Sequence, residues 1–256
     1  MNDSMTNLSS ITKNNKALFL AYDQGLEHGP SDFDDTNIDP SYVLKLGESG
    51  FFTGVILQKG TAKQYYKKDQ NKTPLIVKLN GKTTLQSGEP YAPQLCSVAE
   101  AMDLGASAVG YTIYIGSTFQ EQMMKEFGDI ENESRKQNLP TILWMYPRGK
   151  KVEGKEQSKE ISTYSARIGL ELGADLLKMH YPDEEGAFPE MVKAAGKTGI
   201  LISGGSKESD EELYALAEKS MHEGAFGWAV GRNIWQSENP LKRAEKLAKI
   251  IFNASS

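Results

Sequence analysis

Eight short apolar runs recur along the chain at regular intervals, and each has the length of a β-strand. They are residues 17–23, 51–57, 74–80, 106–114, 141–147, 174–180, 199–205 and 225–231. The segments between them are longer and repeat their apolar residues at a helical period. The pattern therefore predicts eight strands that alternate with helices.

The helical period is clearest in residues 159–173, KEISTYSARIGLELG. Ile161, Tyr164, Ile168 and Leu172 recur there at intervals of three or four residues. This spacing places them on one side of a helix and predicts an apolar face that packs on the rest of the fold.

Residues that start and stop helices lie at the borders of these segments. Asp39 and Asn239 each precede a proline, which places a capping oxygen ahead of a first-turn proline. Ser209, with a glutamate at position 212, fits a capping box. Three helices are expected to stop at a glycine that precedes an alanine, namely Gly105, Gly173 and Gly224.

Eight alternations of strand and helix in 256 residues match the size and order of a (β/α)8 barrel. An open, doubly wound sheet is the alternative, but it rarely uses eight units so evenly. No linker interrupts the pattern, so we expect a single TIM-barrel domain over residues 1–256, with a polar N-terminal segment at 1–16. In such barrels the active site forms at the carboxyl ends of the strands.

Composition excludes several classes of function. Apolar residues make up 39% of the chain and charged residues 25%, which suits a packed globular protein. The net charge of −5 argues against a nucleic-acid surface. No apolar run approaches the roughly 20 residues that span a bilayer, and residues 1–16 lack the apolar core of a signal peptide. A cytoplasmic enzyme or binding protein is expected, with no nucleic-acid or membrane partner.

The cysteine and histidine counts limit metal chemistry. Cys96 is the single cysteine, so neither a disulfide framework nor a cysteine zinc cluster can form. The three histidines are His28, His180 and His222. A three-histidine zinc site is therefore not expected, although a carboxylate-rich Mg²⁺ site remains open.

Polar residues occupy the ends of three apolar runs. Asp23 ends the first run, Tyr146 lies near the end of the fifth, and Lys178 lies near the end of the sixth. Successive side chains along a strand point to opposite faces. If all three point inward, an amine, a phenol and a carboxylate converge at the mouth of the barrel.

A lysine at a strand end has a specific chemical use. A free lysine has a pKa of about 10.4 and is protonated at neutral pH. Burial lowers this pKa, and a cation such as Arg148 would lower it further. The neutral amine attacks carbonyl groups and forms a Schiff base. The alternative is a lysine that pairs with a carboxylate at the rim or extends into solvent, and spacing alone leaves both open.

The seventh and eighth runs carry a second signal. Residues 203–206, SGGS, end the seventh run, and Gly231 with Arg232 end the eighth. Barrels often bind phosphate with the loops after these two strands. Glycine lets backbone N–H groups approach an anion, and arginine adds a charged donor. The two loops therefore predict a phosphate site.

Other residues near the strand ends have alternative roles that the sequence leaves open. Trp144 either forms a pocket wall or fills the barrel. Glu27 and His28 either contact substrate or stabilise a local turn. Lys78 and Lys82 flank the end of the third run without a distinctive motif.

Five segments of the chain resemble one known family. The segments AYDQGLEHGP, WMYPRG, ADLLKMHYP, ISGGSK and AVGRNIWQ occur in the order found in archaeal-type class I fructose-1,6-bisphosphate aldolases, the DhnA-type aldolases. The resemblance covers about residues 17 to 250. It implies a (β/α)8 barrel, Schiff-base chemistry without a metal or other cofactor, a phosphorylated sugar substrate, and a homo-oligomer, often a decamer.

The resemblance also implies roles for individual residues. Lys178 matches the Schiff-base lysine. Tyr146 matches a general acid/base, expected to be ordered by Asp23, the first-strand carboxylate. The residues that match the substrate pocket and phosphate cradle are Trp144, Arg148, Ser203, Gly204, Gly205, Gly231 and Arg232, and His28 is assigned to the same group.

Two alternative functions remain open from the sequence. The first is a related lysine-dependent aldolase or thiolase that acts on another phosphorylated ketone. The segment DQGLEHGP resembles the bisphosphate aldolases more than those relatives. The second is a non-catalytic sugar-phosphate-binding barrel in which Lys178 is only a cation for a second phosphate.

Overall fold

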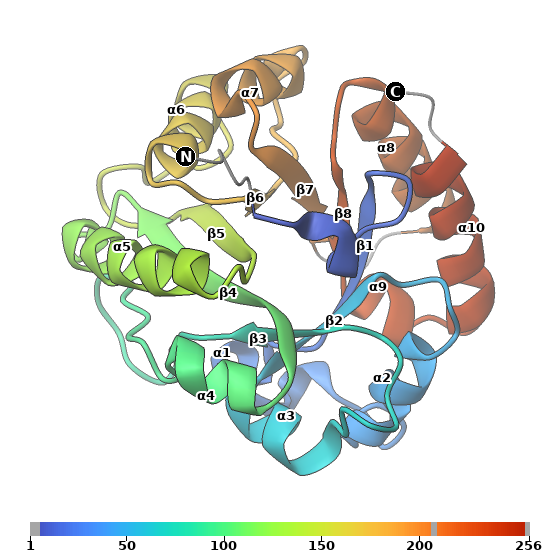
Figure 1. Ribbon diagram of the computed structural model, residues 1–256. Helices are drawn as coiled ribbons and strands as arrows, with labels where there is room; N and C mark the ends of the chain where they lie inside the picture. Colours follow the sequence, from blue (N-terminus) through green and yellow to red (C-terminus); the bar gives the residue numbers. More distant parts are fainter. Residues whose placement is uncertain (1–5, 206–208, 254–256) are drawn as a thin grey trace.

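A computed structural model describes residues 6–205 and 209–253, which fold into a closed barrel of eight parallel strands surrounded by helices (Figure 1). Each strand pairs with the next one along the chain, and β8 closes on β1. The predicted (β/α)8 barrel is confirmed, and the open sheet is excluded. The strands are β1 (Ala17–Ala21), β2 (Gly54–Gln58), β3 (Leu75–Lys78), β4 (Ala106–Ile115), β5 (Thr141–Pro147), β6 (Leu176–Met179), β7 (Gly199–Ser203) and β8 (Gly227–Val230).

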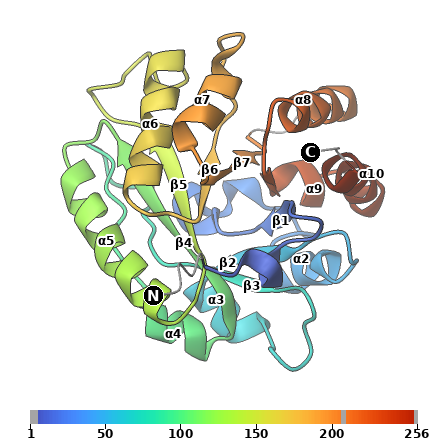
Figure 2. The same cartoon turned by 45° about the horizontal axis from the view of Figure 1, so that its top comes forward.

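Helices connect the strands and cover the outside of the barrel (Figures 1 and 2). They are α1 (Gly25–His28), α2 (Pro40–Gly47), α3 (Lys59–Tyr65), α4 (Val98–Asp103), α5 (Gln120–Lys136), α6 (Lys159–Glu171), α7 (Ala187–Ala195), α8 (Asp210–His222), α9 (Arg232–Trp235) and α10 (Pro240–Asn253), with 3₁₀ helices η1 (Leu8–Ile11) and η2 (Gly29–Asp32). The described helices include none that is long and apolar enough to cross a membrane.

The helix borders follow the signals in the sequence. The Asp39 carboxylate accepts a hydrogen bond from the Ser41 N–H at the start of α2, and Ser209 forms a capping box with Glu212 at the start of α8. The three predicted stop positions have the positive φ values that suit glycine: Gly105 (87°), Gly173 (82°) and Gly224 (102°).

Helix α6 forms where it was predicted, but its fully buried residues are not the predicted apolar ones. Tyr164 is 63% exposed. The buried residues of α6 are small: Ser162, Ser165, Ala166 and Gly169. A Cβ atom at Gly169 would lie 2.4 Å from a methyl group of Leu177 in β6. The helix therefore lies so close to the barrel that only small side chains fit between them. Of the predicted apolar stripe, Ile168 and Leu172 are partly buried and pack against the core, while Tyr164 is exposed.

The polar N-terminal segment contributes to the core. Ile11, at the end of η1, is fully buried. It packs in one cluster with Ala17 and Phe19 of β1 and with inward-facing residues of other strands. Because Ala17 is the first residue of β1, Ile11 closes the amino end of the barrel. A single isoleucine in a polar segment has no periodicity, and sequence analysis missed this role.

The pairing of β5 with β6 sets two layers of side chains near the mouth. Trp144 of β5 lies opposite Lys178 of β6. Successive side chains alternate between the two faces of a strand. The next inward-facing positions towards the carboxyl ends are therefore Tyr146 and His180, and both line the same cavity.

Candidate active site

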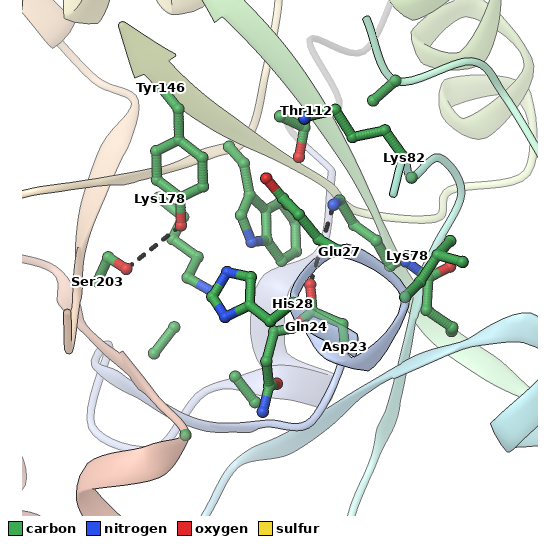
Figure 3. Close-up of a pocket in the computed structure, with 18 of the residues that line it drawn as sticks. Asp23, Gln24, Glu27, His28, Lys78, Lys82, Thr112, Tyr146, Lys178 and Ser203 are labelled. Carbon is green, nitrogen blue, oxygen red and sulfur yellow. Dashed lines mark hydrogen bonds and ion pairs between the residues drawn. The ribbon is translucent and has the colours of Figure 1, made fainter. Parts of the chain in front are cut away.

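A cavity opens at the carboxyl ends of the strands (Figure 3). Each of the eight strands contributes to its lining: Ala21, Gln58, Lys78, Thr112, Trp144, Lys178, Ser203 and Ala229. Every site residue predicted from the sequence lines this cavity: Asp23, His28, Trp144, Tyr146, Arg148, Lys178, Ser203, Gly204, Gly205, Gly231 and Arg232. Ser206, in the predicted phosphate loop, lies outside the described residues.

Lys178 is a deeply buried amine in this cavity. Its side chain belongs to β6, and the residue is 6% exposed. Burial lowers the pKa of this amine, because the ammonium form loses its hydration, while Asp23 and Glu27 act in the opposite direction. Among the described residues, Lys178 forms no ion pair. Sequence analysis named Arg148 as a second cause of the lowered pKa, but the charges that act on Lys178 are those of Asp23 and Glu27, and Arg148 is not among them.

A second lysine, Lys78 of β3, is buried to the same extent. It is 6% exposed, and its Nζ lies 3.9 Å from Oδ2 of Asp23 (Figure 3). Burial lowers the pKa of Lys78, the charges of Asp23 and Glu27 raise it, and the charges of Lys178 and Arg148 lower it further. Asp23 thus forms an ion pair with Lys78, whereas Lys178 has no ion pair among the described residues.

The other carboxylate of the cavity is paired as well. Oε1 of Glu27 lies 2.7 Å from Nη1 of Arg148 and accepts a hydrogen bond from the Tyr114 hydroxyl at 3.1 Å. An unpaired ammonium is costly in a buried site. With Asp23 and Glu27 both engaged by other cations, the neutral amine is expected on Lys178.

The phenol of Tyr146 is held from two sides. Its hydroxyl shares a hydrogen bond of 3.2 Å with Oγ of Ser203 (Figure 3), and its ring stacks on His180 with centroids 4.9 Å apart. Burial raises the pKa of Tyr146, the hydrogen bond from Ser203 lowers it, and Asp23 raises it. The prediction that Asp23 orders Tyr146 was wrong. Ser203 is the hydrogen-bonding partner, and Asp23 pairs with Lys78.

The loops after β7 and β8 meet beside Ser203. The N–H of Gly204 donates to the carbonyl of Ala229 at 3.1 Å. A Cβ atom at Gly231 would lie 2.7 Å from the carbonyl oxygen of Ala21. Both loops are thus packed closely against β1 and β8, and at Gly231 only glycine fits this arrangement.

Arg232 begins α9 and reaches back towards the first-strand loop. Its Nη2 donates to the Gly205 carbonyl at 3.1 Å, and its Nη1 lies 3.5 Å from Oδ1 of Asp32. The other oxygen of Asp32 lies 2.6 Å from Nδ1 of His28. One carboxylate therefore links His28 and Arg232, two of the three basic residues that the sequence assigned to substrate binding.

Sequence analysis did not assign Lys78, His180, Tyr114 or Asp32 to the site. Lys78 is the last residue of a buried strand and Lys178 is the second-last residue of another, and this similar position was the available signal. His180 shares an inward face with Lys178, which was visible from strand alternation. The pairings of Tyr114 and Asp32 depend on contacts between distant segments, and no local pattern indicates them.

Metal-dependent and cysteine-based chemistry have less support in the described residues. Within residues 6–205 and 209–253, no group of three or more His, Cys, Asp or Glu side chains is placed to hold a metal ion. Cys96 is buried and unpaired. It lies in the loop before α4, whose N-cap is Ser97.

Comparisons with known proteins identify the family of the chain. Residues 17–237 match the family described as DeoC/LacD family aldolase. The chain is 47% identical over 248 residues to a class 1 fructose-bisphosphate aldolase from Thermoproteus tenax, which covers 96% of this chain and 93% of that protein.

Solved structures are similar along nearly the whole chain. The structure of an archaeal fructose 1,6-bisphosphate aldolase has a TM-score of 0.91 and 46% identity, covering 96% of this chain and 97% of that one. A further archaeal fructose-1,6-bisphosphate aldolase structure carries its catalytic lysine covalently bound to the carbinolamine intermediate of the substrate. It has a TM-score of 0.90 and 46% identity, with coverages of 96% and 97%.

Proposed function

The chain belongs to the DeoC/LacD family of aldolases, and we propose that it cleaves fructose 1,6-bisphosphate reversibly into dihydroxyacetone phosphate and glyceraldehyde 3-phosphate. It is a lyase of the class I, Schiff-base-forming type. The observation that carries the proposal is the state of Lys178. This amine is buried and has no acidic partner among the described residues, and it lies in a cavity with a phenol and a loop-borne arginine.

The first steps form the imine. The neutral Nζ of Lys178 adds to the C2 carbonyl of the open-chain sugar and gives a carbinolamine. Loss of its hydroxyl group leaves an iminium, and the phenol proton of Tyr146 leaves with that hydroxyl as water. The raised pKa of Tyr146 supports this role, because it keeps the resting phenol protonated.

The carbon–carbon bond then breaks with the iminium as the electron acceptor. The Tyr146 phenolate takes the proton of the C4 hydroxyl, the C3–C4 bond opens, and its electron pair moves into the iminium to give an enamine. Glyceraldehyde 3-phosphate leaves. Protonation of the enamine at C3 and addition of water at C2 release dihydroxyacetone phosphate and return Lys178 to the free amine.

A bisphosphate needs cationic groups at two ends of the cavity. We assign the phosphate of the dihydroxyacetone half to Ser203, Gly204, Gly205, Gly231 and Arg232, the loops after β7 and β8. Ser203 and Lys82 lie on opposite sides of Lys178 in Figure 3. Lys82 and Arg148 therefore suit the other phosphate, while His28 and Trp144 line the space between.

The activity assay separates this function from the alternative ketone substrates. Purified protein incubated with fructose 1,6-bisphosphate should release dihydroxyacetone phosphate and glyceraldehyde 3-phosphate in equal amounts. A larger kcat/KM on another phosphorylated ketone would instead favour the aldolase or thiolase alternative. Absence of turnover on every phosphorylated ketone would favour the non-catalytic barrel.

We also infer that the chain works in the cytoplasm as a homo-oligomer, without nucleic-acid or membrane partners. Tyr164 of α6, which is 63% exposed, supports association because it leaves apolar surface uncovered. Light scattering of the purified protein tests this directly. A monomeric mass at micromolar concentration would contradict it.

A further inference from the structure

His180 lies beside the two residues that the proposed chemistry uses most. It follows Met179, the last residue of β6, and shares the inward face with Lys178. Its ring stacks on that of Tyr146, with centroids 4.9 Å apart and planes inclined by 21°. The imidazole thus forms a flat support for the phenol on the side of β6.

The ring nitrogens of His180 have no partner within the described part of the chain. A neutral imidazole carries one donor and one acceptor, and a polar ring that faces a cavity without protein partners is available to a ligand. Burial, together with the charges of Arg148 and Lys178, lowers the pKa of His180 to about 4. The ring is therefore neutral at physiological pH. It is a weak base and suits hydrogen bonding better than proton transfer.

The layers of the barrel place His180 relative to the substrate. Trp144 and Lys178 form one layer, and Tyr146 with His180 forms the next, about 6.6 Å closer to the mouth. The imine forms at C2, at the tip of the Lys178 side chain, and Tyr146 serves the C4 oxygen. The following hydroxyl, on C5, then lies beside the ring that stacks on Tyr146.

We propose that His180 is a specificity-determining residue of the aldol reaction. The edge of its imidazole hydrogen-bonds the substrate hydroxyl one carbon beyond the cleaved C3–C4 bond, at C5 of the proposed substrate, while its face supports the Tyr146 ring. This assignment rests on the proposed function. It explains why a polar ring, rather than an aliphatic side chain, occupies a position that packing alone would leave to any apolar residue.

The test compares two aldehydes in the condensation direction. Dihydroxyacetone phosphate is offered with glyceraldehyde 3-phosphate or with 3-hydroxypropanal phosphate, which lacks the hydroxyl that becomes C5–OH. The wild-type chain should prefer the hydroxylated aldehyde by about 10- to 100-fold in kcat/KM. His180→Phe keeps the flat support but not the nitrogens, and its preference should fall to about 1- to 3-fold, since no buried donor is left unpaired.

His180→Asn is the matched variant that keeps a hydrogen-bonding group but loses the flat ring. It should retain a preference for the hydroxylated aldehyde and show a lower kcat with both. Borohydride trapping of dihydroxyacetone phosphate on Lys178 reports whether each variant keeps a folded site. A His180→Phe variant that keeps the wild-type preference, or a wild-type chain without any preference, overturns the assignment alone. A wild-type chain that is trapped on Lys178 but condenses neither aldehyde overturns the proposed function, and this assignment with it.

Discussion

The Nζ of Lys78 lies 3.9 Å from Oδ2 of Asp23, deep in the barrel mouth. This pair decides which of two equally buried lysines carries the positive charge. Both amines lie 5.0 Å from the centroid of the Trp144 ring, so the ring does not distinguish them. Because Asp23 stabilises the ammonium of Lys78, Lys178 is the amine that can become neutral and attack a ketone.

Lys78→Met is expected to move the pH profile of the enzyme upwards. In the wild type, kcat/KM should rise with pH through the lowered pKa of Lys178, because only the free amine reacts. Without Lys78, the charge of Asp23 favours the ammonium of Lys178, and the acid limb should shift to higher pH by about one unit. The measurement is kcat/KM for the bisphosphate as a function of pH.

Two further variants serve as controls for this shift. Lys78→Arg retains the positive charge and should keep the wild-type midpoint. The double variant with Asp23→Asn and Lys78→Met removes both charges and should bring the midpoint back. An unshifted acid limb in Lys78→Met would show that the Asp23 charge does not act on Lys178.

Tyr146→Phe should separate imine formation from bond cleavage. Loss of the water can use solvent as the proton donor, so the amount of trapped adduct at equilibrium should stay close to that of the wild type. Proton transfer at C4 has no substitute, and kcat should fall by about 10²- to 10⁴-fold. An unchanged kcat in this variant removes Tyr146 from the mechanism.

Arg232→Met should weaken binding of phosphorylated substrates. A hydrogen bond to a charged group contributes about 1.5–3 kcal/mol, which corresponds to a rise in KM of about 10- to 100-fold. Binding of unphosphorylated dihydroxyacetone should be unaffected. Arg135→Met, in an exposed ion pair with Glu131 on α5, is the control. Equal losses for both ketones would argue against a phosphate contact at Arg232.

Ile11→Ala should reduce stability and leave catalysis intact. Ile11 is fully buried at the amino end of the barrel, away from the cavity. Its truncation should lower the free energy of unfolding by about 2–5 kcal/mol, measured by urea denaturation. Leu241→Ala, at a position 49% exposed on α10, should change stability far less. Equal effects of the two substitutions would show that Ile11 does not close the barrel.

The alternation of strands and helices was predictable because local sequence patterns mark these elements. Strand-length apolar runs and the stop signals at Gly105, Gly173 and Gly224 depend only on neighbouring residues. The inward face of α6 did not follow from its apolar residues, since Gly169 and its small neighbours are selected by the close approach of Leu177. Ile11 packs against strands that lie far along the chain, and a polar segment gives no sign of this.

The position of the site was predictable from the sequence, but the ion pairs and hydrogen bonds between its residues were not. Strand ends identified Lys178, Tyr146 and Asp23 because a barrel brings all its carboxyl ends together. Which carboxylate pairs with which cation depends on the distances between β1, β3 and the loop after β5. In the structure, Asp23 forms an ion pair with Lys78, and Ser203 forms the hydrogen bond with Tyr146.

Reductive trapping tests the central claim about Lys178 most directly. The protein is incubated with dihydroxyacetone phosphate and borohydride, digested, and its peptides are weighed by mass spectrometry. The account predicts a mass increase confined to the peptide that contains Lys178, and none in a Lys178→Met variant. An adduct on the peptide that contains Lys78, or no adduct at all, would contradict it.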